Sequence, residues 1–333
     1  MPSLILRRKL ADSSSGVRAA GMSPPAPIDP RRCTPLVAAA LVLILGWVTA
    51  CSDGASPVAP STGPSALAAV TSSAPSGILV GAGDIGHCGS AGPAATARLL
   101  DDIPGTVIAL GDNAYFSGTA EEFANCYEPT WGRHRSRTRP VPGNHEYASG
   151  AGGYFAYFGE RAGPHATGYY SYSVGPWRVV ALNSELPTGP ESPRGRWLRG
   201  ELGARRDACT AVYWHRPLFS SGRNGNNPDM RDLWRTLYEF DVDLVINAHD
   251  HTYERFAPQD PDGRLDPARG IRQFIVGTGG AQLYEFPRIQ PNSEVRGAAW
   301  GVAIFTLTAG GYQWEFKPVA GTTFTDAGAG YCH

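Results

Sequence analysis

Five short runs after residue 75 are hydrophobic along nearly their whole length. A strand with one face in water alternates apolar and polar residues, whereas a continuous apolar run is typical of a strand covered on both faces. Between these runs, the segments PAATARLLDDI, SPRGRWLRGELGARR and PDMRDLWRTLYEF have helical spacing. Alternation of strand and helix predicts βαβ units and a largely parallel sheet. The runs are ILVGA (78–82), TVIAL (106–110), RVVAL (178–182), TAVYW (210–214) and VDLVI (242–246).

The C-terminal third has a different pattern, in which β-rich runs follow one another with little helix between them. These runs are IRQFIVG, GVAIFTLTA and YQWEFKPVA, and the AGG between the last two favours a hairpin turn. We therefore expect a second, more antiparallel sheet packed on the first. The predicted fold class is α/β, a two-sheet β-sandwich flanked by helices, formed as a single domain by residues 76–333.

The first 75 residues are of another kind. Arg31 and Arg32 precede a mostly apolar run from Leu36 to Ala50, which is shorter than the roughly 20 residues of a membrane-spanning helix and fits an export signal. The residues before Cys51 resemble the lipobox of bacterial lipoproteins, so 1–50 is predicted to be a signal and Cys51 a lipidation site. A plain cleaved signal and an uncleaved anchor are the alternatives. Residues 51–75, rich in Ser, Ala, Pro and Gly, are expected to form a disordered tether.

The number of cysteines and the net charge indicate whether the chain forms disulfides and whether it binds nucleic acid. Four cysteines lie beyond the tether, and in an exported chain an even number favours disulfides over a metal site. Three pairings are possible, of which we prefer Cys88 with Cys126 and Cys209 with Cys332. The 29 Lys and Arg nearly balance the 30 Asp and Glu, and no basic run crosses the domain, so nucleic acid is not an expected partner.

Polar residues with ligand chemistry follow each buried strand. Singly, each has an ordinary explanation, because Gly-Asp after a strand is most often a turn and a lone His is more often a core residue. Together they place carboxylate, amide and imidazole groups where strand ends should converge on one crevice. The residues are Asp84, Asp112, Tyr115, Asn144, His145, His215, His249 and His251.

Mixed oxygen and nitrogen ligands without a thiolate cluster favour a metal site. A catalytic ion typically has three protein ligands, so this set is too large for one ion and fits two. Two ions about 3.5 to 4 Å apart can acidify a water molecule and neutralise phosphate charge. The sequence therefore predicts phosphate ester hydrolysis by a metal-bound hydroxide.

The ordered motifs GDIG, GDNAY, GNHE, an isolated His after a strand, and AHDH followed by TYER resemble the calcineurin-like metallophosphoesterase superfamily. Within it, the chain is similar to purple acid phosphatases, because Tyr115 stands where they use a tyrosinate to hold ferric iron. The resemblance covers roughly Ile78 to Ala320. It implies a single catalytic domain with two metal ions.

The resemblance also implies individual roles. Fe(III) would be held by Asp84, Asp112, Tyr115 and His251, and Zn, Mn or Fe(II) by Asp112, Asn144, His215 and His249, with Asp112 bridging. His145 would face the substrate. Glu146 and Asp250 would fix imidazole orientation by hydrogen bonds, while Arg255 in TYER would pair with an acid.

Two departures from the family pattern are present. After His215, where relatives usually carry further substrate-contacting histidines, stand Arg223 and Asn224. Arg223 could bind phosphate, but it is a poor proton donor. Ala248 replaces a glycine, a mild change if the position needs no positive φ.

The expected activity is that of a phosphomonoesterase acting on small-molecule phosphate esters. A phosphodiesterase or nucleotidase of the same fold and a non-catalytic cell-surface binding protein are the alternatives. The chain is expected to be exported and lipid-anchored, on the outer side of a bacterial cytoplasmic membrane or in the cell envelope. The membrane is then a partner through the lipid anchor alone.

Overall fold

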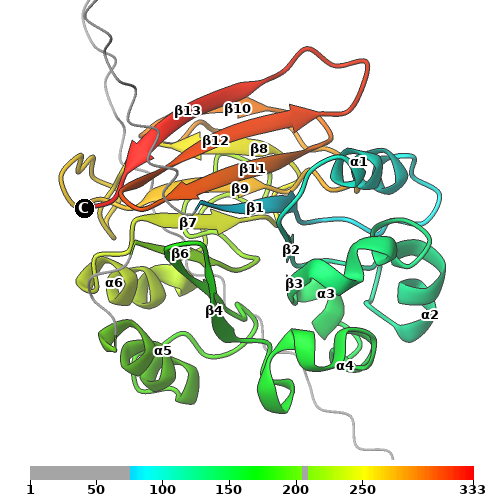
Figure 1. The fold of residues 1–333 in the computed structure, drawn as a ribbon, viewed down its shortest axis with the longest axis horizontal. Coiled ribbons are helices and arrows are strands. Elements are labelled where there is room, and N and C mark those ends of the chain that lie inside the picture. The colour runs from blue at the N-terminus through cyan, green and yellow to red at the C-terminus, as the bar shows by residue number, and fades with distance from the viewer. Residues whose placement is uncertain (1–75, 205–208) are drawn as a thin grey trace, which may run out of the picture. The chain divides into compact units, whose positions relative to one another are not determined.

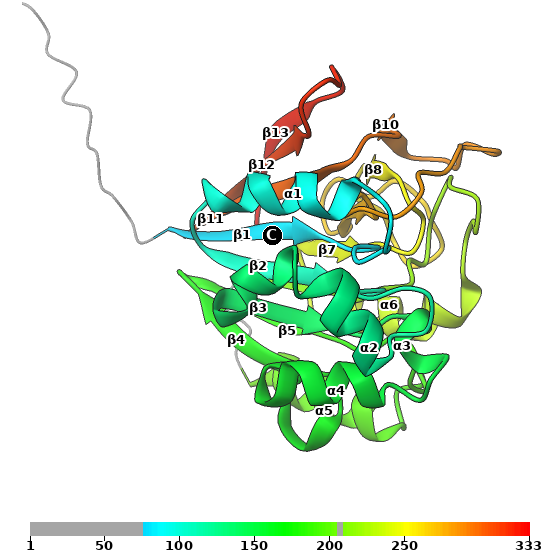
Figure 2. The same cartoon turned by 90° about the vertical axis from the view of Figure 1, so that its right-hand side faces the viewer.

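Two β-sheets and their flanking helices make up the part of the protein that the computed structural model describes, residues 76–204 and 209–333 (Figures 1 and 2). The predicted signal, Cys51 and the tether lie outside the described residues. Within the described ranges, no helix has both the length and the hydropathy needed to cross a bilayer.

One sheet has six strands in the order β13-β12-β11-β1-β2-β3. Strands β1, β2 and β3 are parallel, and the remaining neighbours are antiparallel. The strands are β1 (Gly77–Ala82), β2 (Thr106–Leu110), β3 (Thr138–Val141), β11 (Gly301–Thr308), β12 (Gly311–Pro318) and β13 (Asp326–Tyr331).

The other sheet has seven strands in the order β10-β8-β9-β7-β6-β5-β4. Its centre, β5-β6-β7-β9, is parallel, and antiparallel strands flank it on both sides. The strands are β4 (Tyr170–Val174), β5 (Trp177–Ala181), β6 (Thr210–Tyr213), β7 (Leu244–Asn247), β8 (Tyr253–Phe256), β9 (Arg272–Val276) and β10 (Ser293–Gly297).

The α/β class, the two sheets and the outer helices are as predicted, but the expected division between the sheets is wrong. The C-terminal third does not form a sheet of its own. Strand β9, from the run IRQFIVG, continues the parallel part of the seven-stranded sheet, whereas β11 and β12 pair with β1. The predicted hairpin between β11 and β12 is present, with Thr308 opposite Gly311.

The helices lie outside the sheets, and α5 and α6 occur near one another beside the seven-stranded sheet (Figure 1). Helix α5 begins after Ser192, whose hydroxyl accepts a hydrogen bond from the Gly195 amide, with Pro193 in the first turn. The α-helices are α1 (Gly92–Asp101), α2 (Ala120–Glu122), α3 (Asn144–Tyr147), α4 (Gly152–Phe158), α5 (Pro193–Gly203) and α6 (Arg231–Glu239). Shorter helical turns are η1 (Phe123–Tyr127), η2 (Trp131–Arg137), η3 (Gly159–Ala162), η4 (Pro164–Ala166) and η5 (Pro228–Met230).

Burial on both faces explains why the central strands are continuously apolar. Val179, Ala211 and Leu244 belong to the larger core, which includes residues of the six-stranded sheet. Their neighbours in the chain, Val180, Val212 and Val245, belong to a second core. Because successive side chains of a strand point to opposite faces, each strand contributes to both cores. The second core includes Leu198 and Leu202 of α5 and Leu233, Trp234 and Leu237 of α6.

Both expected disulfides are present. Cys88 is bonded to Cys126, and Cys209 to Cys332. The second bond ties the residue before β6 to the residue after β13, so it joins the two sheets.

Candidate metal centre

The eight candidate residues lie where strands of both sheets end. Asp84 follows β1, Asp112 follows β2 and Asn144 follows β3, all in the six-stranded sheet. His215 follows β6 and His249 follows β7, both in the seven-stranded sheet. The prediction that strand ends converge holds, but the crevice is built from two sheet edges where a single edge was expected.

The first group of ligand atoms surrounds the Tyr115 hydroxyl. This oxygen lies 2.9 Å from Asp84 Oδ1, 3.3 Å from Asp112 Oδ2 and 3.1 Å from His251 Nε2. His251 Nε2 is itself 3.4 Å from Asp84 Oδ1. All four side chains are buried. Two carboxylates, a phenol and an imidazole therefore face one point, as predicted for the iron ligands.

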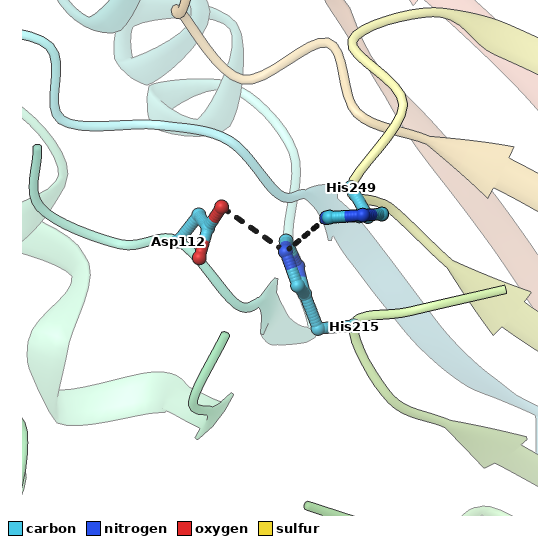
Figure 3. A group of neighbouring side chains, drawn as sticks. All are labelled: Asp112, His215 and His249. Carbon is cyan, nitrogen blue, oxygen red and sulfur yellow. Dashed lines mark hydrogen bonds and ion pairs between the residues drawn. The ribbon is translucent and has the colours of Figure 1, made fainter. Parts of the chain in front are cut away.

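The second group surrounds His215 Nε2 (Figure 3). This nitrogen lies 3.1 Å from Asp112 Oδ2, 3.2 Å from Asn144 Oδ1 and 3.2 Å from His249 Nδ1. Asp112, His215 and His249 each offer a ligand atom, and these atoms lie within 4.8 Å of one another. The predicted ligands of the second ion thus form a second cluster.

Asp112 belongs to both groups, because the same oxygen, Oδ2, approaches Tyr115 and His215. Its other oxygen, Oδ1, accepts a hydrogen bond from the His145 amide at 2.9 Å. The backbone before Asn144 comes close here, since a Cβ on Gly143 would lie 2.2 Å from Asp112 Oδ1. Glycine at 143 is therefore required for the two loops to meet.

Three ligands occupy the left-handed region of backbone conformation. Asp84 has a φ of 58°, Asp112 of 48° and His249 of 73°. Non-glycine residues adopt such angles at a cost of about 1–3 kcal/mol, which the surrounding structure must offset. Ala248 does not have a positive φ. The replacement of the family's glycine by alanine at this position therefore causes no backbone strain.

Backbone carbonyls orient two of the imidazoles. His215 Nδ1 lies 2.9 Å from the Leu110 carbonyl, and His251 Nδ1 lies 2.6 Å from the Gln282 carbonyl. A carbonyl accepts but does not donate, so in both rings Nδ1 carries a proton, and Nε2 is the nitrogen that can bind a metal ion once it has lost any proton of its own. This tautomer is the one that metal binding through Nε2 needs.

The roles predicted for Glu146 and Asp250 are wrong. Glu146 accepts hydrogen bonds from the amides of Asn113, Ala114 and Gly143, and so it holds loops instead of an imidazole. Asp250 accepts from the Ser220 hydroxyl and the Asn224 amide. Both residues support the loops that carry the candidate ligands. Their partners are backbone and hydroxyl groups that no motif reveals.

The electrostatics favour a cation at this place. Burial opposes ionisation of Asp84 and Asp112, but the positive charges of His251 and His215 outweigh it and lower the pKa of both carboxyls. In return, although burial opposes their charge, the carboxylates raise the pKa of His251 and raise that of His215 to about 10. Burial and the two carboxylates raise the pKa of Tyr115 well above 10. Burial also lowers the pKa of His249 to about 3. The ionised carboxylates and the neutral His249 are in the forms that bind metal ions, whereas Tyr115, His215 and His251 would release protons when a cation binds.

His145 lies at the open side of the site. Its Nδ1 is 2.6 Å from the Phe116 carbonyl, its Nε2 is 3.8 Å from Asp112 Oδ2, and its side chain is 30 % exposed. The ring lies 4.4 Å from that of Tyr115, centroid to centroid. This half-exposed imidazole has the position expected of a group that faces substrate.

Tyr284 and Arg223 form a further part of the rim. The Tyr284 ring stacks on His251 at 4.0 Å, and the exposed Arg223 guanidinium lies 5.5 Å above the Tyr284 ring. The Tyr284 ring therefore lies between Arg223 and His251, one of the candidate ligands. Tyr284 was not among the predicted site residues, because it stands in a loop with no flanking motif.

The segment TYER is structural, as expected. Arg255 pairs with Asp326 at 2.7 Å and also contacts Glu294, which links strand β8 to β13 and β10. Tyr253 donates a hydrogen bond to Asp326 at 2.7 Å.

Comparison with known proteins gives a consistent result. A family model described as calcineurin-like phosphoesterase matches residues 79–253, more than half of the chain. An uncharacterized protein of Mycobacterium tuberculosis is 31 % identical over 199 residues, which cover 45 % of this chain and 38 % of that protein. Purple acid phosphatase 21 of Arabidopsis thaliana is 32 % identical over 148 residues, which cover 41 % of this chain and 33 % of the relative.

These alignments span less than half of either relative. Among solved structures, a purple acid phosphatase from yellow lupin (Lupinus luteus) seeds is similar in fold, with a TM-score of 0.62 and 20 % identity. That similarity covers 76 % of this chain and 53 % of the lupin protein.

Proposed function

The chain belongs to the calcineurin-like phosphoesterase family, and we propose that it is a phosphoric ester hydrolase, specifically a binuclear metal-dependent phosphomonoesterase of the acid phosphatase type. The observation that carries this proposal is the pair of ligand groups that share one oxygen, Asp112 Oδ2. A carboxylate shared between two clusters suits a two-ion centre, in which the ions are commonly bridged by a carboxylate and lie about 3.5–4 Å apart.

The residues present fit two ions of different kinds. Tyr115 in the first group, with Asp84, Asp112 and His251, suits Fe(III), while Asp112, Asn144, His215 and His249 suit Zn, Mn or Fe(II). When bound, the two ions supply positive charge that neutralises a phosphate ester and acidifies water. The protein supplies the fixed orientation of both groups.

His145 would act on the substrate side. The Phe116 carbonyl holds its Nδ1–H, which leaves Nε2 directed to the open side of the centre. From there, Nε2 can donate a hydrogen bond to the phosphoryl oxygens or a proton to the leaving group. A guanidinium can donate hydrogen bonds but does not transfer a proton. The role of Arg223 would therefore be to attract the phosphate dianion at the rim of the site.

Hydrolysis of matched esters tests the proposal. The purified, metal-loaded protein should turn over p-nitrophenyl phosphate with a higher kcat/KM than bis(p-nitrophenyl) phosphate. Cleavage of the diester alone would favour the phosphodiesterase alternative. Binding of less than about one metal ion per chain would count for a non-catalytic cell-surface protein instead.

A visible absorption spectrum tests the ferric assignment. A tyrosinate bound to Fe(III) colours a protein, and Tyr115→Phe should abolish the band. A colourless, fully active wild-type protein would contradict Fe(III) while leaving the hydrolase intact.

We also propose export and lipid attachment through Cys51, on the basis of the sequence alone. Cells fed a labelled fatty acid should incorporate it into the wild-type protein and not into Cys51→Ser. Release of unlabelled wild-type protein into the medium would argue for a plain cleaved signal.

A further inference from the structure

A large aromatic side chain stands in solvent beside the metal ligand Tyr115. Phe116 is 64 % exposed, and only a few large apolar side chains of the described residues, Leu265, Ile289 and Tyr331 among them, are comparably exposed. Its backbone carbonyl holds His145, so the residue lies between a metal ligand and the substrate-facing imidazole. A single exposed apolar side chain needs no explanation by itself, but this one stands beside the candidate reaction centre, where apolar and aromatic side chains commonly line ligand sites.

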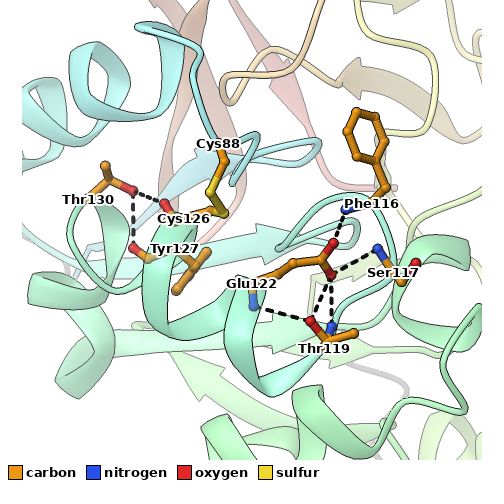
Figure 4. Close-up of a disulfide and its surroundings, with 8 residues drawn as sticks. All are labelled: Cys88, Phe116, Ser117, Thr119, Glu122, Cys126, Tyr127 and Thr130. Atoms are coloured by element: carbon orange, nitrogen blue, oxygen red, sulfur yellow. Dashed lines mark hydrogen bonds between the residues drawn. A yellow bond between two sulfur atoms is a disulfide. The ribbon is translucent and has the colours of Figure 1, made fainter.

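The backbone that carries Phe116 is held in place (Figure 4). The Glu122 carboxylate accepts hydrogen bonds from the Phe116, Ser117 and Thr119 amides, the last two at 3.0 and 2.9 Å. Thr119 in turn caps the short helix that contains Glu122. Because one side chain bonds three amides of the same loop, the exposure of Phe116 is a property of an ordered loop.

The Phe116 ring belongs to an aromatic cluster that leads to the metal centre. Its centroid lies 4.9 Å from that of His87 in an edge-on arrangement, and 6.1 Å from that of Tyr115. His87 lies 6.0 Å from Tyr115 as well. The Cys88–Cys126 disulfide fixes the residue after His87 (Figure 4).

His87 also lines a hollow of about 390 Å³, together with Ser90, Gln282, Leu283 and Trp300 among others. It borders the first ligand group, since the Gln282 carbonyl is the acceptor for His251. A flat group leaving the metal centre in this direction would meet aromatic and apolar surface.

We propose that Phe116, with His87, binds the aromatic part of the leaving group of a phosphate monoester, which is the ring of an aryl alcohol or the base of a nucleoside. Aromatic side chains favour flat rings because stacked and edge-on contacts add to the burial of apolar area. The inference rests on the proposed phosphatase activity and names its preferred substrates.

Three esters separate the contributions: phenyl phosphate, adenosine 5′-monophosphate and glycerol 3-phosphate. In Phe116→Ala, kcat/KM should fall about tenfold for an aromatic ester and remain unchanged for glycerol 3-phosphate. A fall in kcat/KM for phenyl phosphate alone indicates that Phe116 binds the ring of aryl esters. A fall for the nucleotide alone indicates that Phe116 binds the base, which the ribose separates from the phosphate. Equal effects on all three esters, or no effect on any, overturn the proposal.

Two further variants control for disturbance of Tyr115. Phe116→Tyr keeps the ring and should retain the aromatic preference. Leu265→Ala removes another exposed apolar side chain, 57 % exposed, and should change nothing. Metal content measured for each variant must match wild type.

The two proposals fail separately. Absence of turnover of all three esters by the metal-loaded wild type contradicts the phosphatase. In that case, calorimetry still tests Phe116. Phenylphosphonate should bind the wild type more tightly than methylphosphonate does, and Phe116→Ala should remove that difference. An unchanged difference overturns the role of Phe116.

Discussion

His249 and His251 are two residues apart in the chain, yet they lie in different ligand groups. His249 Nδ1 approaches His215, while His251 Nε2 approaches Tyr115 and Asp84. We therefore expect His249→Ala to lose the second ion and His251→Ala to lose the first, together with any tyrosinate absorption. Metal analysis of each variant beside its visible spectrum checks this. Loss of both ions to the same extent in each variant would contradict the division.

His145 should contribute to turnover without holding an ion. Removal of a general acid or of a donor to the phosphoryl oxygens typically costs about 10²- to 10⁴-fold in rate. We expect such a fall in kcat for His145→Gln, with two metal ions retained. His165→Gln, at an exposed histidine, is the matched control. A variant that loses its metal would show that His145 is a ligand.

The ligands could be predicted from sequence because strand-end motifs carry them, and the structure brings every one of the seven into its expected group. The groups that orient them could not. The carbonyls of Leu110 and Gln282 belong to the backbone, which has the same chemistry at every position. Tyr284 and Phe116 reach the site because of the conformations of their loops. A loop conformation depends on contacts that no motif shows, such as those that Glu122 makes with the loop of Phe116.

At the level of secondary-structure elements, hydrophobic patterns identified most of the strands and long helices that position the site. They did not reveal which sheet a strand joins. Strand β9 and strand β11 have similar apolar sequences, yet β9 pairs with β7 and β11 pairs with β1. Pairing depends on contacts between residues far apart in the chain. The short helices α2 to α4 were also missed, because three to seven residues are too few to show a helical period.

The Cys209–Cys332 disulfide should stabilise the attachment of β13 without affecting catalysis. It closes a loop with a sequence separation of 123, for which chain entropy predicts about 5 kcal/mol, and natural bonds of this kind are worth about 2–5 kcal/mol. Cys209 precedes β6, whereas the ligand His215 follows it. The double variant Cys209→Ser/Cys332→Ser should therefore unfold at lower urea concentration with kcat unchanged.

Wild type with its disulfides reduced is the control for this pair, and it should lose at least as much stability as the double variant. An unchanged unfolding midpoint in the variant would show that the pairing of β13 with β12 holds the strand in place without the disulfide.

At the level of the whole molecule, metal removal should lower stability as well as activity. Asp84 and Asp112 are buried carboxylates whose charges two cations would neutralise. An ion bound only by the folded protein adds about 2.7 kcal/mol at a free concentration of 100 times its Kd. We expect a chelator to abolish turnover and lower Tm, and added metal to restore both.

Asp112→Asn supplies the matched control, because it retains the shape of the side chain and removes the shared charge. Its Tm should respond little to the chelator. A wild-type Tm that is independent of metal concentration would speak against ions that bind only the folded state.

The pairing of β1 with β11 has a consequence for the order in which the protein is made. Ribosomes synthesise the N-terminus first, so Asp84 and the other six ligands all exist before Gly301, the first residue of β11. Until then, β1 can pair with β2 on one side but has no partner strand on the other. Ile304, which lies opposite Val80 in the finished sheet, has not yet been synthesised. A nascent chain halted at residue 300 would contain every candidate ligand but would lack β11, β12 and β13. We expect ions to be acquired after translation is complete and, for an exported chain, after translocation.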